Sequence, residues 1–174
     1  MSELSKQNIF LVGPMGSGKS SVGRQLARKK KLRFIDCDQV IIDRTGVEIS
    51  LIFEIEGENG FRKREKNIID ELTAEDGIVL ATGGGAVLDP DNRNHLTGRG
   101  TVIYLRASID QILKRTRKDT KRPLLNTDNP AEKLRQILAE REAYYEEVAD
   151  MIIDTDNRTV KNVVEEICNR EIKK

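Results

Sequence analysis

A loop with very few side chains constrains the fold of this chain more than any other stretch of its sequence. The loop lies between a short apolar run and a helix-like segment within residues 9–29, and it reads Gly13-Pro14-Met15-Gly16-Ser17-Gly18-Lys19-Ser20. Its glycines allow backbone N–H groups to close around phosphate oxygens, and the start of a helix adds a positive dipole end. The pattern G-x-x-x-x-G-K-[ST] in this context predicts a binding site for a nucleoside triphosphate.

Short apolar runs alternate with helix-like segments along the rest of the chain. The continuous, β-branched-rich runs that are typical of strands buried on both faces are residues 8–12, 32–36, 77–82, 101–105 and 151–154. The helix-like segments are residues 19–30, 50–74, 108–117, 130–149 and 160–172. This alternation predicts an α/β fold in which a parallel sheet is covered on both faces by helices. Residues 117–129 have no periodicity and are rich in charge, Pro and Asn, as lid loops often are.

Length and charge exclude several classes of protein. The 174 residues suit a single domain, 1–174. Lys and Arg number 30 against 29 Asp and Glu, and this balance argues against a general nucleic-acid-binding surface. The apolar runs are too short to span a membrane, and the N-terminus lacks the apolar core of a secretory signal, so we expect a cytoplasmic protein. No long exposed apolar patch is readable, which favours a monomer.

Two side chains of the loop and two acids further along suit phosphate chemistry. We expect Lys19 to reach the β- and γ-phosphates, and the Ser20 hydroxyl to complete the octahedral shell of Mg²⁺. Asp36 and Asp38 follow a predicted strand, and in an extended chain their carboxylates face the same way. One carboxylate could support Mg²⁺ through water, while the other accepts the proton of an acceptor hydroxyl. The alternative is a solvated turn with two helix-capping acids.

Three further stretches could hold an acceptor. Arg62 and Glu65 are i,i+3 neighbours, and spacing alone favours an ordinary surface ion pair over an arginine held in position. Three glycines in a row, 83–85, end a buried strand and favour a backbone wall against a ligand over a plain turn. Arg141 lies on the inward stripe of its helix, so it must pair with a protein carboxylate or an anionic ligand, and spacing leaves both open. Together, Arg62 and Arg141 could clamp an anionic group.

These features favour transfer of phosphate onto a small acceptor. The Asn-Lys-x-Asp motif with which GTPases read guanine is absent from the sequence. The alternative in a different class is a module that binds ATP without transferring phosphate. Such modules usually lose the acceptor acid or the loop lysine, whereas Lys19, Asp36 and Asp38 are all present here.

As a set, these residues resemble the shikimate kinase family over essentially the whole chain. The resemblance is carried by GPMGSGKSSVGRQLA, FIDCDQVI, IFEIEGENGFRKRE, VLATGGGAV, TVIYL, RPLL and ILAEREAYYEEVAD. It implies a three-layer α-β-α P-loop kinase fold with a five-stranded parallel sheet, a helical substrate-binding section near 37–65 and a lid near 117–129. It also implies transfer of a phosphoryl group from ATP, with Mg²⁺, to the 3-hydroxyl of shikimate. The residues alone leave open another small-molecule P-loop kinase, such as a gluconate kinase or a nucleoside monophosphate kinase.

The resemblance further implies a role for each matching residue. Asp38 would bind shikimate hydroxyls and accept the proton of the 3-hydroxyl, and Arg122 would move with the lid to touch the phosphates. The implied catalytic residues are Asp38, Lys19 and Arg122, and the implied metal-binding residues are Ser20 and Asp36. The implied shikimate-binding residues are Asp38, Arg62, Gly83, Gly84, Gly85 and Arg141. The implied nucleotide-binding residues are Gly13, Gly16, Ser17, Gly18, Lys19, Ser20, Ser21, Arg115, Arg122 and Arg158.

Overall fold

A computed structural model describes residues 7–117 and 127–171 of the chain, and its strands form one parallel sheet. The strand order is β2-β3-β1-β4-β5, so the first strand lies in the centre of the sheet. The strands are β1 Ile9–Val12, β2 Arg33–Asp36, β3 Ile78–Ala81, β4 Thr101–Arg106 and β5 Met151–Asp154. Each lies within one residue of a predicted run. The three central strands are almost wholly buried, which is why their apolar residues are continuous rather than alternating.

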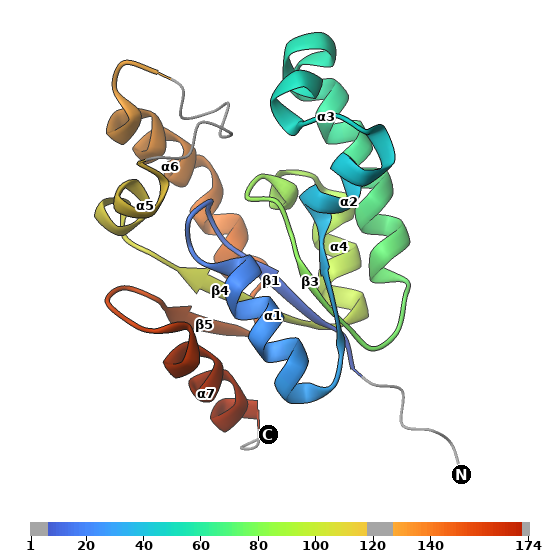
Figure 1. Cartoon of the computed structure of the whole chain (residues 1–174), viewed down its shortest axis with the longest axis vertical. Coiled ribbons are helices and arrows are strands. Elements are labelled where there is room, and N and C mark those ends of the chain that lie inside the picture. The colour runs from blue at the N-terminus through green and yellow to red at the C-terminus, as the bar shows by residue number, and fades with distance from the viewer. Residues whose placement is uncertain (1–6, 118–126, 172–174) are drawn as a thin grey trace.

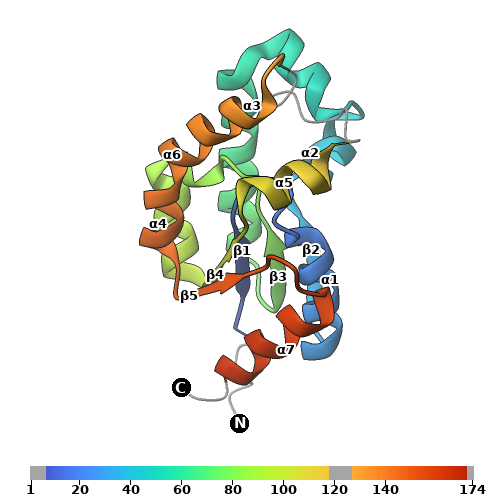
Figure 2. The same cartoon turned by 90° about the vertical axis from the view of Figure 1, so that its left-hand side faces the viewer.

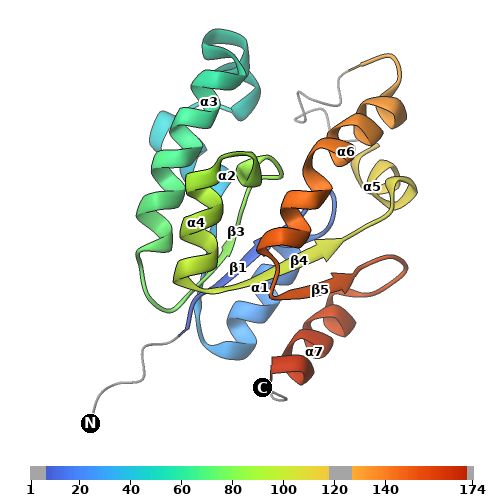
Figure 3. The ribbon, with the colours of Figure 1, turned by 180° about the vertical axis from the view of Figure 1, so that it is seen from behind.

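Helices cover both faces of the sheet and give the molecule three layers. The helices are α1 Lys19–Lys30, α2 Cys37–Thr45, α3 Ile49–Thr73, α4 Pro90–Arg99, α5 Ile109–Thr116, α6 Pro130–Val148 and α7 Val160–Glu171. A short 3₁₀ turn, η1, spans Ala86–Leu88. Helices α1 and α7 cover one face (Figure 1), and α4 and α6 cover the other (Figure 3). The expected three-layer α/β fold with five parallel strands is confirmed.

Two helices were missing from the expectations drawn from periodicity, and one expected helix is interrupted. Helix α2 begins directly after β2, where an extended chain was expected, and its nine residues are too few for a clear periodic signal. Helix α4 is so polar that it shows no apolar stripe, and its clearest sequence signal is its start, where Asp89 caps the helix and Pro90 is the first helical residue. The expected helix 50–74 corresponds to α3, whose backbone breaks at Gly57.

The arrangement brings several loops to one edge of the sheet. Because all five strands are parallel, the segments that follow β1, β2 and β3 leave the sheet at the same edge. Figure 2 shows α3 and α6 extending beyond the sheet on this side. Most of the expected lid, 117–129, lies outside the described residues, and Arg122 lies outside them as well. No helix in the described ranges is long and apolar enough to cross a membrane.

Candidate active site

A cavity of about 500 Å³ lies at this edge of the sheet. Its walls come from the loop after β1, the start of α2, α3, the glycines after β3, and single arginines of α5 and α6. Of the residues expected at the site, those that line the cavity are Gly16, Gly18, Lys19, Ser20, Ser21, Asp36, Asp38, Arg62, Gly83, Gly84, Gly85, Arg115 and Arg141. The structure therefore joins the expected phosphate loop to the expected acceptor residues in one space.

The loop after β1 has the backbone shape that an anion site requires. Gly13 has a φ of 146°, and a Cβ there would lie 2.5 Å from the carbonyl oxygen of Leu105, so only glycine fits. Gly18 is the N-cap of α1, with a φ of 95°, and it has no side chain that could accept a hydrogen bond from the first turn. The first-turn N–H groups of α1 are thus available to phosphate oxygens.

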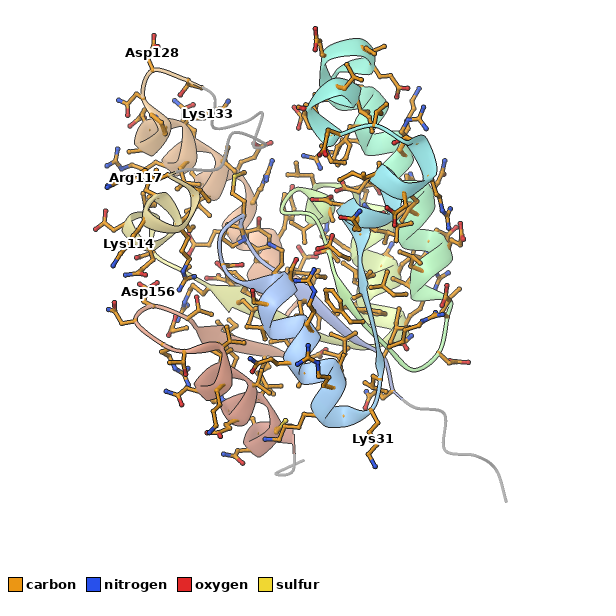
Figure 4. All side chains as sticks on the ribbon, in the orientation of Figure 1. Lys31, Lys114, Arg117, Asp128, Lys133 and Asp156 are labelled. Atoms are coloured by element: carbon orange, nitrogen blue, oxygen red, sulfur yellow. The ribbon has the colours of Figure 1, made fainter. Side chains whose placement is uncertain are left out.

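Lys19 points back over the same loop. Its Nζ donates hydrogen bonds to the carbonyl oxygens of Gly13, at 2.7 Å, and Pro14, at 2.8 Å. The charge is therefore held over the loop that presents the N–H groups. By contrast, the basic run lies at the C-terminal end of α1, beside the Lys31 labelled in Figure 4, and thus at the end of the helix opposite the loop. That run complements the negative end of the helix dipole.

Asp36 and Asp38 both reach the cavity, but the reasoning from an extended chain was wrong. Asp36 is the N-cap of α2, where its Oδ1 accepts from the backbone N–H of Gln39 at 3.2 Å, and Asp38 lies in the first helical turn. The capping alternative is therefore correct for Asp36, and capping does not remove it from the cavity. Cys37 between them is fully buried, and burial raises the pKa of its thiol.

Ser20 and Asp36 form a pair of hard oxygen donors beside the loop. The Ser20 hydroxyl donates to Asp36 Oδ2 at 2.5 Å. Within residues 7–117 and 127–171 no three His, Cys, Asp or Glu side chains form a metal-binding group. A hydroxyl and a carboxylate beside a phosphate loop fit Mg²⁺, which takes few protein ligands and completes its shell with phosphate and water.

Arg62 and Glu65 are not a surface ion pair, so the interpretation that spacing favoured was wrong. Glu65 is 1% exposed, and its Oε1 accepts from Arg62 Nη1 at 2.8 Å. Arg62 also pairs with Glu58, at 3.3 Å. Glu65 was left out of the expected site, although its place at the end of the stretch IFEIEGENGFRKRE, which carried part of the resemblance, was the available signal. Its burial depends on tertiary contacts that i,i+3 spacing does not reveal.

The glycines after β3 leave room for this pair. A Cβ at Gly83 would lie 2.6 Å from Glu65 Oε2 and 3.1 Å from Asp38 Oδ1. A Cβ at Gly85 would overlap the guanidinium of Arg62. The expectation of a backbone wall is thus incomplete, because the missing side chains also make space for the acid and the arginine that face the cavity.

Arg141 is 3% exposed and reaches the cavity from α6. No carboxylate lies within 4.0 Å of it in the described part of the chain, which favours an anionic ligand over a protein partner.

One turn further along α6, the hydroxyl of Tyr145 donates to the carbonyl oxygen of Gly84 at 2.5 Å. Burial raises the pKa of Tyr145 to about 12, so the hydroxyl remains a donor. Tyr145 also stacks on Tyr104, with ring centroids 5.0 Å apart.

Arg115 and Arg158, both implied by the resemblance to bind the nucleotide, are placed differently. Arg115 lines the cavity and donates to the carbonyl oxygens of Gly16, at 2.9 Å, and Thr155, at 3.0 Å. It thereby ties the phosphate loop to the segment after β5. Arg158 does not line the cavity, because its guanidinium donates to the Asp154 carbonyl at 3.0 Å and pairs with Glu166 of α7.

The burial of Glu65 makes the free energy of unfolding depend on whether its carboxyl group is protonated. Burial raises its pKa from 4.5 to about 6, against the lowering effect of Arg62 and with a smaller raising effect from Asp38. The folded state therefore binds this proton more tightly than the unfolded state, so the stability that it contributes is present below pH 4.5 and is lost as pH rises through about 6.

We expect this loss to appear as a difference between the unsubstituted chain and Glu65→Gln. The free energy of unfolding of the unsubstituted chain, relative to the variant, should fall by about 2 kcal/mol in total from well below pH 4.5 to well above pH 6. Urea denaturation at a series of pH values measures it. A difference that stays flat across this range would contradict the raised pKa.

Comparisons with known proteins agree with the geometry. The family model described as shikimate kinase matches residues 15–171. A shikimate kinase from Legionella pneumophila (strain Corby) is 56% identical over 167 residues, covering 96% of this chain and 95% of the relative. One from Photobacterium profundum is 55% identical over 164 residues, covering 94% of each.

Solved structures give the same result. Shikimate kinase from Acinetobacter baumannii, solved in complex with shikimate, superimposes with a TM-score of 0.95 at 44% identity, covering 97% of this chain and 94% of that one. A gluconokinase from Sinorhizobium meliloti 1021 has a TM-score of 0.61 at 20% identity, covering 92% and 88% of the two chains, and shares the fold alone. With a matching family model, close relatives and a common fold, this chain belongs to the shikimate kinase family.

Proposed function

We propose that this chain transfers the γ-phosphoryl group of ATP to the 3-hydroxyl of shikimate, giving ADP and shikimate 3-phosphate. The observation that carries the proposal is the shared cavity in which the loop bearing Lys19 faces Asp38, Arg62 and Arg141. A phosphate site, one acid and two cations suit a donor triphosphate and an acceptor with both hydroxyl and carboxylate groups. The shikimate complex of the Acinetobacter relative supports this choice of acceptor.

At the donor end, the loop and the first turn of α1 would bind the phosphates through backbone N–H groups. Lys19 would exchange its contacts with the loop carbonyls for phosphate oxygens and so stabilise charge that builds up during transfer. Arg115 lines the same cavity and would lie beside the nucleotide. A nucleotide-binding role has less support for Arg158, because it does not line the cavity and contacts the Asp154 carbonyl instead. For Arg122, which lies outside the described residues, a contact to the phosphates rests on the family resemblance.

Ser20 and Asp36 are the residues that would hold Mg²⁺, since they offer a hydroxyl and a carboxylate next to the phosphate loop. When bound, the ion supplies charge neutralisation at the β- and γ-phosphates. Asp36 also fixes its own orientation by capping α2, so the carboxylate is in place before any ligand enters.

At the acceptor end, Asp38 would orient the 3-hydroxyl and accept its proton as the oxygen attacks phosphorus in line with the leaving ADP. Arg62 and Arg141 would bind the shikimate carboxylate by charge-assisted hydrogen bonds. Glu65 would hold Arg62, and Tyr145 would hold the backbone at Gly84, so that the site keeps its shape when the acceptor binds. We also propose that the enzyme is a cytoplasmic monomer, which rests on the sequence.

The experiment that tests the proposal is ADP release from Mg·ATP by the purified chain, with shikimate, gluconate, AMP or no acceptor in parallel. Release that depends on shikimate supports the proposal. Release only with gluconate or AMP would assign another acceptor to the same P-loop fold. No ADP release with any of the acceptors would favour an ATP-binding module without transferase activity.

Removing either arginine of the acceptor end should weaken shikimate binding and leave ATP binding intact. We expect Arg62→Ala and Arg141→Ala each to raise the KM for shikimate by about 10- to 150-fold, the equivalent of about 1.5–3 kcal/mol for a lost charge-assisted bond. The KM for ATP should change less than threefold. Steady-state kinetics with each substrate varied in turn makes the measurement.

Arg135→Ala is the matched control, because Arg135 lies on the same helix as Arg141 but is exposed and contacts Glu132 on the surface. It should change neither KM. A shikimate KM that stays unchanged in both cavity variants would exclude these arginines as the carboxylate clamp.

A further inference from the structure

The start of α3 and the two residues before it form an arm that is bounded by two glycines. We define the acceptor arm as residues 47–56, between Gly46, with a φ of 74°, and Gly57, with a φ of 72° and a ψ of 177°. A Cβ on either glycine would meet no atom within 4 Å. A side chain would thus have room at either position, but the backbone angles there favour glycine, most strictly at Gly57.

The acceptor arm forms a wall of the cavity. Glu48, Ile49 and Phe53 line it from the arm, and Arg62 lines it from beyond the break in α3. Phe53 packs on Phe61, with ring centroids 4.9 Å apart, which joins the arm to the helical turn that carries Arg62. The angle of the arm at Gly57 thus determines where this wall stands relative to the acceptor end.

One ion pair spans the break. Arg64 Nε donates to Glu56 Oε2 at 2.9 Å, and Arg64 Nη2 donates to Glu56 Oε1 at 2.6 Å. In a continuous helix these residues, eight positions apart, would be separated by about 12 Å along the axis. The two-pronged contact therefore exists only because the chain turns back at Gly57.

Gly60 permits the same turn. A Cβ at position 60 would overlap the Cβ of Glu56, so the Glu56 side chain lies directly over the backbone of the following turn. Gly57 allows the backbone to turn, and Gly60 allows the Glu56 side chain to approach the backbone of the next helical turn. Arg64 then binds the Glu56 carboxylate. Neither Glu56 nor Arg64 lines the cavity.

We infer that Glu56 and Arg64 are a positioning pair that fixes the angle of the acceptor arm and thereby sets the affinity for the acceptor. The pair acts through Phe53 and Ile49, which face the cavity, and it touches no part of the nucleotide end. This inference rests on the proposed function, since it assigns the arm to shikimate. Apolar side chains of the arm, with Ile52 only 3% exposed, pack on the core, and the partly exposed Glu56–Arg64 pair adds a bidentate contact across the break.

The test is steady-state kinetics of Glu56→Gln, Arg64→Gln, the reversals Glu56→Arg and Arg64→Glu, and the double reversal. We expect the neutral variants to raise the KM for shikimate by about two- to fivefold, as for a partly exposed ion pair, with the KM for ATP unchanged. The single reversals should raise it further because they place like charges together, and the double reversal should return it to within about twofold of the unsubstituted value. High salt should reduce the difference between the unsubstituted chain and the neutral variants.

Arg44→Gln and Glu71→Gln are the matched controls. Arg44 and Glu71 form another exposed two-pronged pair, at 2.8 and 2.6 Å, that also involves α3 but lies outside the cavity wall. They should lower the melting temperature about as much as the Glu56 and Arg64 variants and leave the shikimate KM unchanged. A shikimate KM unaffected by loss of the Glu56–Arg64 pair, a parallel rise in the ATP KM, or no rescue by the double reversal would overturn the inference. Absence of shikimate turnover in the unsubstituted chain would instead overturn the proposed function.

Discussion

Replacing Asp38 with asparagine is expected to lower kcat by about 10²- to 10⁴-fold, the range for loss of a general base. Asp38 lies in the first turn of α2 at the cavity wall, and its Oδ1 is 3.1 Å from the position that a Cβ on Gly83 would take. Asparagine keeps the size of the side chain and one oxygen that accepts a hydrogen bond, but it cannot take a proton from an acceptor hydroxyl at neutral pH. Shikimate-dependent ADP release measures the loss, and calorimetric titration with Mg·ATP should show that nucleotide binding persists.

Asp43→Asn provides the control for this variant. Asp43 lies on the same helix, is exposed, and accepts a hydrogen bond from the side chain of Gln39 at 2.9 Å, outside the cavity lining. It should retain turnover within about twofold, as surface substitutions usually do. Near-normal turnover in Asp38→Asn would remove Asp38 from the mechanism, whereas equal losses in both variants would point to a general effect on α2.

Replacing Lys19 with methionine is expected to lower kcat/KM for ATP by about 10²- to 10³-fold, as for loss of one preorganised charge at a transferring phosphoryl group. The ammonium lies over the phosphate loop, held by the Gly13 and Pro14 carbonyls, so it is in place before the nucleotide binds. Methionine preserves the length of the side chain and removes its charge. Initial rates at varied ATP give the loss, and calorimetric titration should show that shikimate still binds.

The control for Lys19 lies at the other end of the same helix. Lys29 is exposed in the last turn of α1, and Lys29→Met removes one positive charge without touching the cavity. Its turnover should match that of the unsubstituted chain. If Lys19→Met kept most of its activity, or lost shikimate binding to the same degree as ATP turnover, the assignment of Lys19 to the phosphates would be wrong.

The fold and the nucleotide end of the site could be predicted because their signals are local. A strand buried on both faces shows as a continuous apolar run, and the phosphate loop shows as glycines followed by Lys19 and Ser20 at fixed spacing. The loop dictates the conformation of its own backbone, so neighbouring residues suffice to recognise it. Helix α2 was missed because nine residues immediately after a strand give little periodicity, and its capping acid was taken as part of an extended chain.

The acceptor end was only partly predictable, because its chemistry depends on burial. Arg62 and Glu65 have the same i,i+3 spacing as any surface pair, and packing against the glycines after β3 makes Glu65 inaccessible to water. The contacts of Arg158 could not be predicted either, since Glu166, with which it pairs, lies on the helix that follows β5. Such outcomes depend on which segments pack together.

Local sequence patterns were enough to predict the five strands, most of the helices and the phosphate loop. They were enough because apolar periodicity and glycine conformation act over a few neighbouring residues. Three features became visible only in the folded chain. The first is the burial of Glu65, and the second is that Arg141 faces the cavity with no carboxylate within 4.0 Å in the described part of the chain. The third is the contact between Glu56 and Arg64 across the break at Gly57. The first two features depend on distances between segments that the linear chain does not specify, and they are set by the packing of α3 and α6 against the sheet, whereas the third depends on the backbone turn at Gly57.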